Sequence, residues 1–323
     1  MSTEVSIIIK ALNEEKNIAR AIKSSKAATK GMDAEIILAD SLSTDKTVEI
    51  AKKEKIKIVQ LKNASDRSCG IGPQLGYQYA SGKYIYILDG DMELEKGFLK
   101  KAIMELEKDK KLAGIAGQVK EMNTQNIVFE RRKKGKKQVG YFDKLEMGGL
   151  YKREALEDVG YFSNRNLHAY EEAELGFRLT SKGWKLKRVN IPGVKHYGYT
   201  TNTFGVFKKR WKTRYVKGSG EFLRSSFGKP YFLKTLWHLK IYVFLAFWWL
   251  LFVLSIVINY SDLTKTWLII SIFLLVLFFL KKKDVKEFSF SIVSWHYSTI
   301  GLIWGFFSPK KNPNRKISAK VIK

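Results

Sequence analysis

Short apolar runs alternate with helical patterns over the first hundred residues, and this alternation limits the possible folds more than any other feature. Four runs, at residues 5–9, 35–39, 56–61 and 84–88, have the length and composition of buried strands. Helical patterns follow the first two runs, and a short helix is expected at about 74–80. Strands that alternate with helices predict an α/β fold with a mostly parallel, doubly wound sheet.

Polar loops follow three of these runs, at residues 10–14, 40–45 and 89–91. Ligands of doubly wound sheets bind outside the carboxyl ends of the strands, so the three loops are expected around one crevice. In the third loop two carboxylates flank Gly90, an arrangement that suits Mg²⁺ or Mn²⁺ beside a diphosphate. The alternative is an acidic turn, because Asp-Gly is common in turns.

The chain is basic and has 323 residues, enough for two domains. Lys and Arg number 58 against 31 Asp and Glu, and the net charge of +27 favours an anionic partner, either nucleic acid or a membrane surface. We recognise no nucleic-acid-binding motif, so nucleic acid is not an expected partner. Cys69 is the single cysteine and no signal peptide is visible, so the soluble part is expected in the cytosol.

Apolar residues concentrate in the last third of the chain. Two transmembrane helices are expected, at about 238–260 and 263–280, because each run is long enough to span a bilayer. Lysines before the first helix and after the second predict that both ends lie in the cytosol. A more polar segment at 288–307 is expected to be re-entrant or interfacial, with a third crossing as the alternative.

Three motifs, in this order, resemble family 2 glycosyltransferases. SIIIKALNEEKNI is similar to the opening strand and Asn-Glu loop of the family, with Lys10 and Leu12 in place of the usual Pro and Tyr. EIILADSLSTDKT resembles the second strand and its Asp-x-Ser-x-Asp-x-Thr loop, and ILDGDMEL resembles the metal-binding DxD. The resemblance implies a GT-A fold, a nucleotide-diphosphate sugar donor and transfer with inversion.

By the same resemblance, Asp40 accepts a hydrogen bond from the nucleotide base and Glu14 lies near the ribose. Asp91 would bind the cation, Mn²⁺ or Mg²⁺, and Asp89 would bind the cation or the ribose. Two adjacent glycines, Gly148 and Gly149, would close over the diphosphate. The implied donor-binding residues are Lys10, Asn13, Glu14, Asp40, Arg67, Asp89, Gly148 and Gly149.

An acidic pair at the start of a predicted helix, Glu171 and Glu172, resembles the family's general base. The second member of the pair is usually Asp, and here it is Glu172, so Glu171 is a competing candidate for the base. The helix dipole also favours carboxylates at a helix N-terminus, which is the alternative explanation of the pair.

Two further positions resemble sites of the family. His196 falls where members often place a His near the donor phosphates, so it is a candidate metal or phosphate ligand, although a lone His is more often structural. Arg210 and Trp211 match half of the QxxRW motif of processive polysaccharide synthases and are candidates for acceptor or phosphate contacts. Phe207 occupies the Gln position, which weakens the case for processive synthesis.

Together these features predict a metal-dependent, inverting glycosyltransferase at the cytosolic face of a membrane. Its acceptor would be lipid-linked or a saccharide, modified at a hydroxyl or phosphate during cell-surface polysaccharide or glycoconjugate assembly. The alternative is an inactive membrane subunit that binds a nucleotide sugar. The expected domains are a GT-A catalytic domain (1–230), a membrane region (231–308) and a basic cytosolic tail (309–323).

Overall fold

The computed structural model of the chain describes residues 3–123, 127–134, 139–146, 148–198 and 201–323. The chain divides into two units: unit 1 is Met1–Thr201 with Pro309–Lys323, and unit 2 is Asn202–Ser308. This division differs from the expected domains in two places. Residues 202–230 group with the apolar helices, and residues 309–323 group with the sheet of unit 1.

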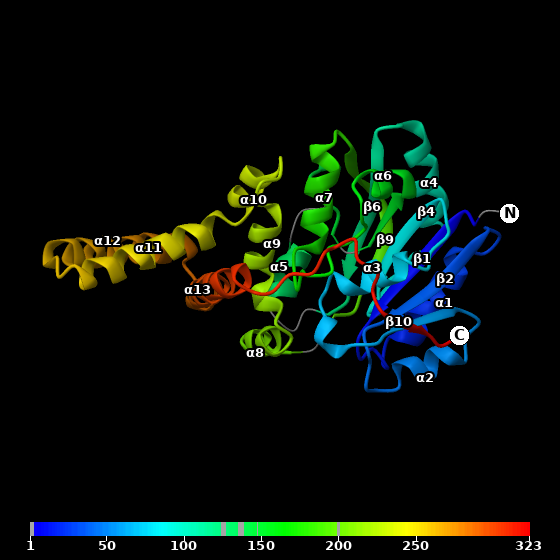
Figure 1. Ribbon diagram of the computed structural model, residues 1–323, viewed down its shortest axis with the longest axis horizontal. Coiled ribbons are helices and arrows are strands. Elements are labelled where there is room, and N and C mark those ends of the chain that lie inside the picture. The colour runs from blue at the N-terminus through cyan, green and yellow to red at the C-terminus, as the bar shows by residue number, and fades with distance from the viewer. Residues whose placement is uncertain (1–2, 124–126, 135–138, 147, 199–200) are drawn as a thin grey trace. The chain divides into compact units, whose positions relative to one another are not determined.

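The four expected strands form the parallel half of the sheet in unit 1 (Figure 1). They are β1 (Val5–Ala11), β2 (Ala34–Asp40), β3 (Lys57–Leu61) and β4 (Tyr84–Asp89). The connections contain α1 (Ile18–Ala28), α2 (Thr47–Lys52), the short η1 (Ala64–Asp66) and α3 (Ile71–Tyr77). The pairs β3–β2, β2–β1 and β1–β4 are all parallel, so the prediction from the alternating pattern is confirmed for this half.

Beyond β4 the sheet becomes mixed. The further strands are β5 (Met92–Leu94), β6 (Leu112–Glu121), β7 (Gly140–Phe142), β8 (Gly149–Lys152) and β9 (Lys185–His196). The helices between them are α4 (Phe98–Lys108), α5 (Ile127–Lys134), α6 (Arg153–Asp158) and α7 (Glu171–Ser181). With β10 (Ala319–Val321) at one edge, the order is β10-β3-β2-β1-β4-β8-β6-β9-β5. Strand β7 pairs with β9, and β8 is antiparallel to both β4 and β6.

Strands β1 and β4 are covered on both faces. Ile7 and Tyr86 belong to one apolar cluster, whereas Ile8 and Ile85 belong to the cluster on the opposite face. A strand buried on both faces needs apolar side chains at successive positions. This burial explains why both strands read as continuous apolar runs in the sequence.

The last residues of the chain are part of the sheet. Strand β10 (Ala319–Val321) runs antiparallel to β3, and Ile317 just before it is 1% exposed. Pairing continues beyond the strand, because Ile322 N donates to Ile58 O. Residues 319–322 therefore cover the open edge of β3, which the expected basic tail did not anticipate.

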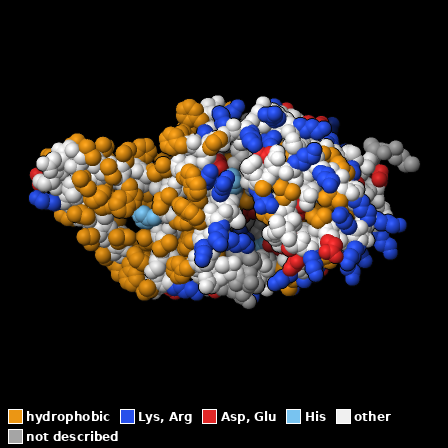
Figure 2. Space-filling view, turned by 60° about the horizontal axis from the view of Figure 1, so that its bottom comes forward, with side chains coloured by type: hydrophobic (Ala, Val, Ile, Leu, Met, Phe, Trp, Pro, Cys, Tyr) orange, Lys and Arg blue, Asp and Glu red, His pale blue; other side chains and the backbone are white. Residues whose placement is uncertain are grey.

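Unit 2 is helical. Its elements are α8 (Gly205–Lys212), η2 (Tyr215–Lys217), α9 (Gly218–Ser226), α10 (Phe232–His238), α11 (Lys240–Val257), α12 (Ser261–Lys282) and α13 (Val285–Phe306). Helices α11 and α12 correspond to the two expected spans, and by length and mean hydropathy (2.2 and 2.3) each could cross a membrane. Hydrophobic side chains cover the surface of these two helices (Figure 2).

Helix α13 is continuous and packs beside the hairpin of α11 and α12. Its Trp295 ring lies 4.7 Å from Phe278 near the end of α12, and Thr299 Oγ1 donates to Tyr242 O in the first turn of α11. Close backbone approach joins α13 to α9, since a Cβ on Gly220 would lie 2.0 Å from Leu302 O. The segment expected at 288–307 is thus a continuous helix that contacts those ends of the hairpin.

Candidate active site

The parallel register brings the polar loop residues to one edge of the sheet. Lys10 of β1 is the partner of Asp89 on β4, and Ala11 is the partner of Asp40 on β2. Gly90 follows directly, and a Cβ at that position would lie 2.8 Å from Glu14 Cγ. The close approach of the first and fourth strand loops therefore requires the glycine between the two aspartates.

Lys10 joins two acidic elements of this edge. Its Nζ lies 3.1 Å from Asp89 Oδ1 and 3.3 Å from Glu171 Oε1. Burial lowers the pKa of Lys10, but the carboxylates of Asp89, Glu171 and Glu172 outweigh it and hold the pKa well above its usual value. Lys10 is therefore a fixed positive charge between the end of β4 and the start of α7.

The two candidate bases lie in the first turn of α7. Tyr170, immediately before them, has a left-handed backbone with φ of 68°, an uncommon conformation for a residue with a side chain. Burial and the neighbouring Glu171 carboxylate raise the pKa of Glu172 to about 8. A carboxyl group with this pKa can take up a proton near neutral pH, as a general base must.

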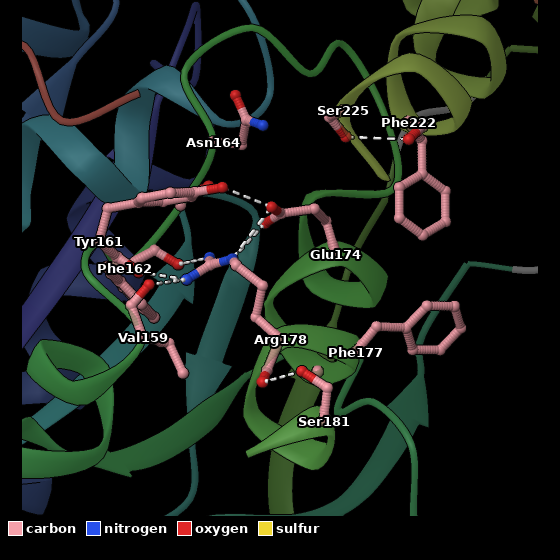
Figure 3. A network of polar contacts seen from close by, with 12 residues as sticks. Val159, Tyr161, Phe162, Asn164, Glu174, Phe177, Arg178, Ser181, Phe222 and Ser225 are labelled. Atoms are coloured by element: carbon pink, nitrogen blue, oxygen red, sulfur yellow. Dashed lines mark hydrogen bonds and ion pairs between the residues drawn. The ribbon is translucent and has the colours of Figure 1, made fainter. Parts of the chain in front are cut away.

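A buried ion pair fixes the orientation of α7. Arg178 Nε lies 2.9 Å from Glu174 Oε2, and its other nitrogens donate to the backbone oxygens of Val159, Tyr161 and Phe162. The Tyr161 hydroxyl donates to Glu174 as well, and its ring stacks on the guanidinium at 3.7 Å. Figure 3 shows this network connecting the helix to the preceding segment. It holds the helix that carries Glu171 and Glu172.

Asp91, the second carboxylate of the DxD loop, contacts His196 at the end of β9. His196 Nε2 lies 3.4 Å from Asp91 Oδ2, and its Nδ1 lies 2.7 Å from Glu121 Oε2 at the end of β6. Burial lowers the pKa of His196, but its hydrogen bonds to Asp91 and Glu121 prevail and raise it to about 9. Burial raises the pKa of Asp91, but the hydrogen bond and the charge of His196 together with the charge of Lys10 outweigh it and lower the pKa of that carboxyl.

These side chains are suitable ligands for a divalent cation. Asp91 and His196 already converge, while Asp89 is turned toward Lys10. Among the described residues, no three His, Cys, Asp or Glu side chains gather closely enough to form a complete metal cluster. The carboxylates suit Mg²⁺ or Mn²⁺, and the imidazole favours Mn²⁺ because Mg²⁺ prefers oxygen ligands.

The residues expected to hold the nucleotide form a second group beside β2. Asp40 is fully buried, and its carboxylate accepts from Gln60 Nε2 at 2.8 Å and from Ser43 N. Arg67 donates to the backbone oxygens of Ser41 and Leu42. Asp40 and Arg67 thus both hold the loop after β2.

Asn13 and Glu14 lie at the same loop. Asn13 Oδ1 accepts from Thr44 N at 2.8 Å, and Glu14 N donates to Thr47 Oγ1 at 2.7 Å. These contacts join the loop after β1 to the loop after β2. The structure therefore brings together the expected residues of these two loops, as the parallel sheet predicts.

The remaining expected residues lie farther along the chain. Gly148, with φ of +86°, precedes β8, and a Cβ there would lie 2.8 Å from the Tyr86 hydroxyl; Gly149 begins the strand. Arg210 and Trp211 are in unit 2, on α8. The Trp211 ring lies 5.2 Å from that of Trp304, and the Arg210 guanidinium lies over Tyr215. In unit 2, Trp211 therefore packs α8 against α13.

Three residues of the site were not anticipated from the sequence. Gln60 lies near the end of the expected strand at 56–61, so its position at the carboxyl edge was a usable signal, and Glu121 is the last residue of β6. Arg178 lies in α7 four residues after Glu174, the spacing of an ion pair on one helix face.

Two family models match the chain. The model described as Glycosyl transferase family 2 matches residues 6–160, and the one described as Glycosyl transferase family group 2 matches residues 148–281. A curated relative, 4,4'-diaponeurosporenoate glycosyltransferase of Staphylococcus haemolyticus, is 30% identical over 105 residues. That match covers 31% of this chain and 28% of the relative, so the chain spans little more than a quarter of the relative's length.

Solved structures share the fold. The crystal structure of S. aureus TarS 1-349 in complex with UDP-GlcNAc is 17% identical, with a TM-score of 0.51 over 69% of this chain and 72% of that chain. S. aureus TarS matches at 16% identity and a TM-score of 0.50 over 70% of this chain and 44% of that chain. This likeness confirms the expected GT-A fold class. The two family models together match residues 6–281, and they identify the chain as a member of glycosyltransferase family 2.

Proposed function

We propose that the chain transfers a sugar, with inversion, from a nucleotide-diphosphate donor to a lipid-linked acceptor at the cytosolic face of a membrane. One observation carries the proposal: Lys10 connects the DxD carboxylate Asp89 to Glu171, which lies beside the candidate base Glu172. A cation site and a proton acceptor at one sheet edge are the two groups that such a transfer needs. Membership of family 2 supports the reaction class.

The donor would lie along the loops after β1, β2 and β4. A protein of the same fold was crystallised with UDP-GlcNAc, which supports a nucleotide sugar as the ligand. The proposed contacts are Lys10, Asn13, Glu14, Asp40, Arg67, Asp89, Gly148 and Gly149. Because Asp40 is fully buried, a donor base reaches it only when the loop after β2 shifts.

Asp89, Asp91 and His196 would hold the divalent cation. When bound, the cation offsets the charge that develops on the departing diphosphate. Glu121 holds the Nδ1 of His196 and leaves Nε2 toward Asp91, so Nε2 would bind the cation after losing the proton that it donates to Asp91. The mixed donor set leads us to favour Mn²⁺ over Mg²⁺.

Glu172 is the proposed base. Glu171 is engaged by Lys10, whereas burial keeps the pKa of Glu172 at about 8, close to the working range of a proton acceptor. Glu172 would take the proton from the acceptor hydroxyl as that oxygen attacks the anomeric carbon. The departing diphosphate leaves from the opposite face, which inverts the configuration at that carbon.

A membrane setting follows from unit 2. Helices α11 and α12 have the length and hydropathy of membrane spans, and their surfaces are largely apolar. Strand β10 pairs with β3 of the same sheet as β1, so the chain between them must cross the membrane an even number of times. Two crossings by α11 and α12 satisfy this condition, with α13 as an interfacial helix. A hydrophobic acceptor fits such a location.

The test is a donor panel. The full chain in detergent is incubated with UDP-, GDP- and dTDP-sugars and Mn²⁺, and release of the nucleotide is measured. We expect turnover with at least one donor and its loss on addition of EDTA. The substitution Asp91→Ala should abolish the metal-dependent part. Binding of a donor without any turnover, with or without a lipid acceptor fraction, would instead support the inactive subunit.

A further inference from the structure

Lys10 contacts carboxylates from two elements that are far apart in the sequence. Asp89 ends β4 and Glu171 begins α7, and the Lys10 ammonium lies within 3.3 Å of both. The Lys10 side chain is 20% exposed and that of Glu171 is 11% exposed, so solvent screens this contact only partly. Such shielded ion pairs interact more strongly than pairs on the surface.

The position of the ammonium is set by the backbone. Lys10 is paired in register with Asp89, and a Cβ at Gly72 of α3 would lie 2.9 Å from Lys10 Cβ. The stem of Lys10 therefore leaves the strand beside a glycine that gives it room. The side chain can then reach α7, and the contact depends on both the sheet register and α3.

Three carboxyl groups share this part of the site. The pKa of Lys10 is raised by all three, Asp89, Glu171 and Glu172. The pKa of Glu172 is raised in turn by Asp89 and Glu171. Without a positive charge among them these groups would repel one another. Lys10 relieves that repulsion at the cost of engaging Asp89, one of the proposed cation ligands.

We infer that Lys10 is a positioning residue that couples the cation-binding loop to the helix carrying the base, and that it competes with the divalent cation for Asp89. The inference rests on the proposed function, because it takes Asp89 as a cation ligand. An ordinary structural ion pair is the competing explanation. The two differ in one respect: loss of a structural pair loosens the site, whereas loss of a competing charge tightens cation binding.

The first measurement is Mn²⁺ binding to the full chain in detergent, without donor, followed by the electron paramagnetic resonance signal of free Mn²⁺. Lys10→Met and Lys10→Gln should each bind Mn²⁺ about tenfold more tightly than the unmodified chain, since a repelling charge beside Asp89 is gone. Lys10→Arg should remain within about twofold, because it keeps the charge. Lys83→Met is the matched control, since Lys83 lies just before β4 and pairs with Glu107 of α4, away from Asp89.

The second measurement tests the coupling without metal or activity. In EDTA, the Glu171→Gln variant should have a lower thermal unfolding midpoint than the unmodified chain, because an ion pair with Lys10 is lost. In the Lys10→Met background the same substitution should raise the midpoint, because it then removes a repelling carboxylate. This reversal of sign requires Lys10 to hold Glu171 among the other acids.

The outcomes separate the inference from the proposed function. If the unmodified chain binds no Mn²⁺, the proposed cation site is wrong. If it binds Mn²⁺ but both neutral variants bind equally or more weakly while Lys83→Met is unchanged, competition by Lys10 is refuted. If Glu171→Gln acts in the same direction in both backgrounds, the coupling is refuted. Two neutral variants are used so that one poorly folded protein does not decide the result.

Discussion

The pH dependence of Glu172 offers the most direct test of the proposed base. Its carboxyl has a pKa of about 8 against an ordinary value of 4.5, because burial and the charge of Glu171 oppose ionisation. Lys10 acts in the opposite direction, and Asp89 and Glu146 add to the increase. At pH 7 roughly a tenth of the Glu172 carboxyl groups would be ionised, and at pH 8 about half.

If ionised Glu172 is the base, turnover should rise about fivefold from pH 7 to pH 8 and level off above about pH 9. The assay is donor turnover at saturating Mn²⁺ over pH 6 to 9.5, with Glu172→Gln in parallel. That variant should lose about 10²-fold or more and show no such rise. A cation at the neighbouring carboxylates lowers the pKa, so a midpoint below 8 is compatible with the reasoning. A flat profile, or a fully active Glu172→Gln, refutes it.

The same carboxyl predicts a stability effect whose sign can be worked out. The folded pKa is raised, so the folded state holds the proton more tightly than the unfolded state, and stability falls as pH rises from about 4.5 through about 8. Glu172→Gln removes this loss, which amounts to a few kcal/mol of unfolding free energy between low and high pH. In EDTA at pH 9 the variant should therefore unfold at a higher temperature than the unmodified chain, and the two should converge near pH 4.5. A lower midpoint for the variant at pH 9 would contradict the buried, destabilised carboxylate.

Three further predictions concern the supports of the site. Glu121→Gln weakens the hold on His196 and should reduce Mn²⁺ affinity about 10- to 100-fold by titration, with the unfolding midpoint used to exclude general damage. Arg178→Met leaves Glu174 buried without its cation and should cost about 3 kcal/mol or more in chemical unfolding, whereas an unchanged stability would show that the network is dispensable. Ile317→Ala should cost about 2–4 kcal/mol, and equal stability would mean that the C-terminal segment does not pack on β3 in solution.

The sequence predicts the parallel half of the fold well because the information is local. Buried strands such as β4 appear as apolar runs, and the DxD follows directly at residues 89–91. Parallel pairing then requires that the loops of β1, β2 and β4 share one edge. The grouping of Asn13, Glu14 and Asp40 therefore follows from the order of strands and loops along the chain.

The parts of the fold and of the site that the sequence does not predict depend on contacts between distant segments. That β8 is antiparallel to β4 does not follow from composition, and neither does the meeting of Glu121 with His196. The charge of residues 309–323 predicts a solvated tail, yet Ile317 and Ile322 make that segment a strand partner. The role of Lys10 was hidden for the same reason, because its second partner lies on α7.

The pairing of β10 with β3 also sets an order of events during synthesis. Residues 319–321 emerge after both apolar helices, so the sheet of unit 1 cannot be completed until α11 and α12 have been made. Until then β3 has an unpaired edge that other strands could occupy. Completion of unit 1 therefore waits for synthesis of the apolar helices, and a chain arrested before residue 319 would keep an incomplete sheet.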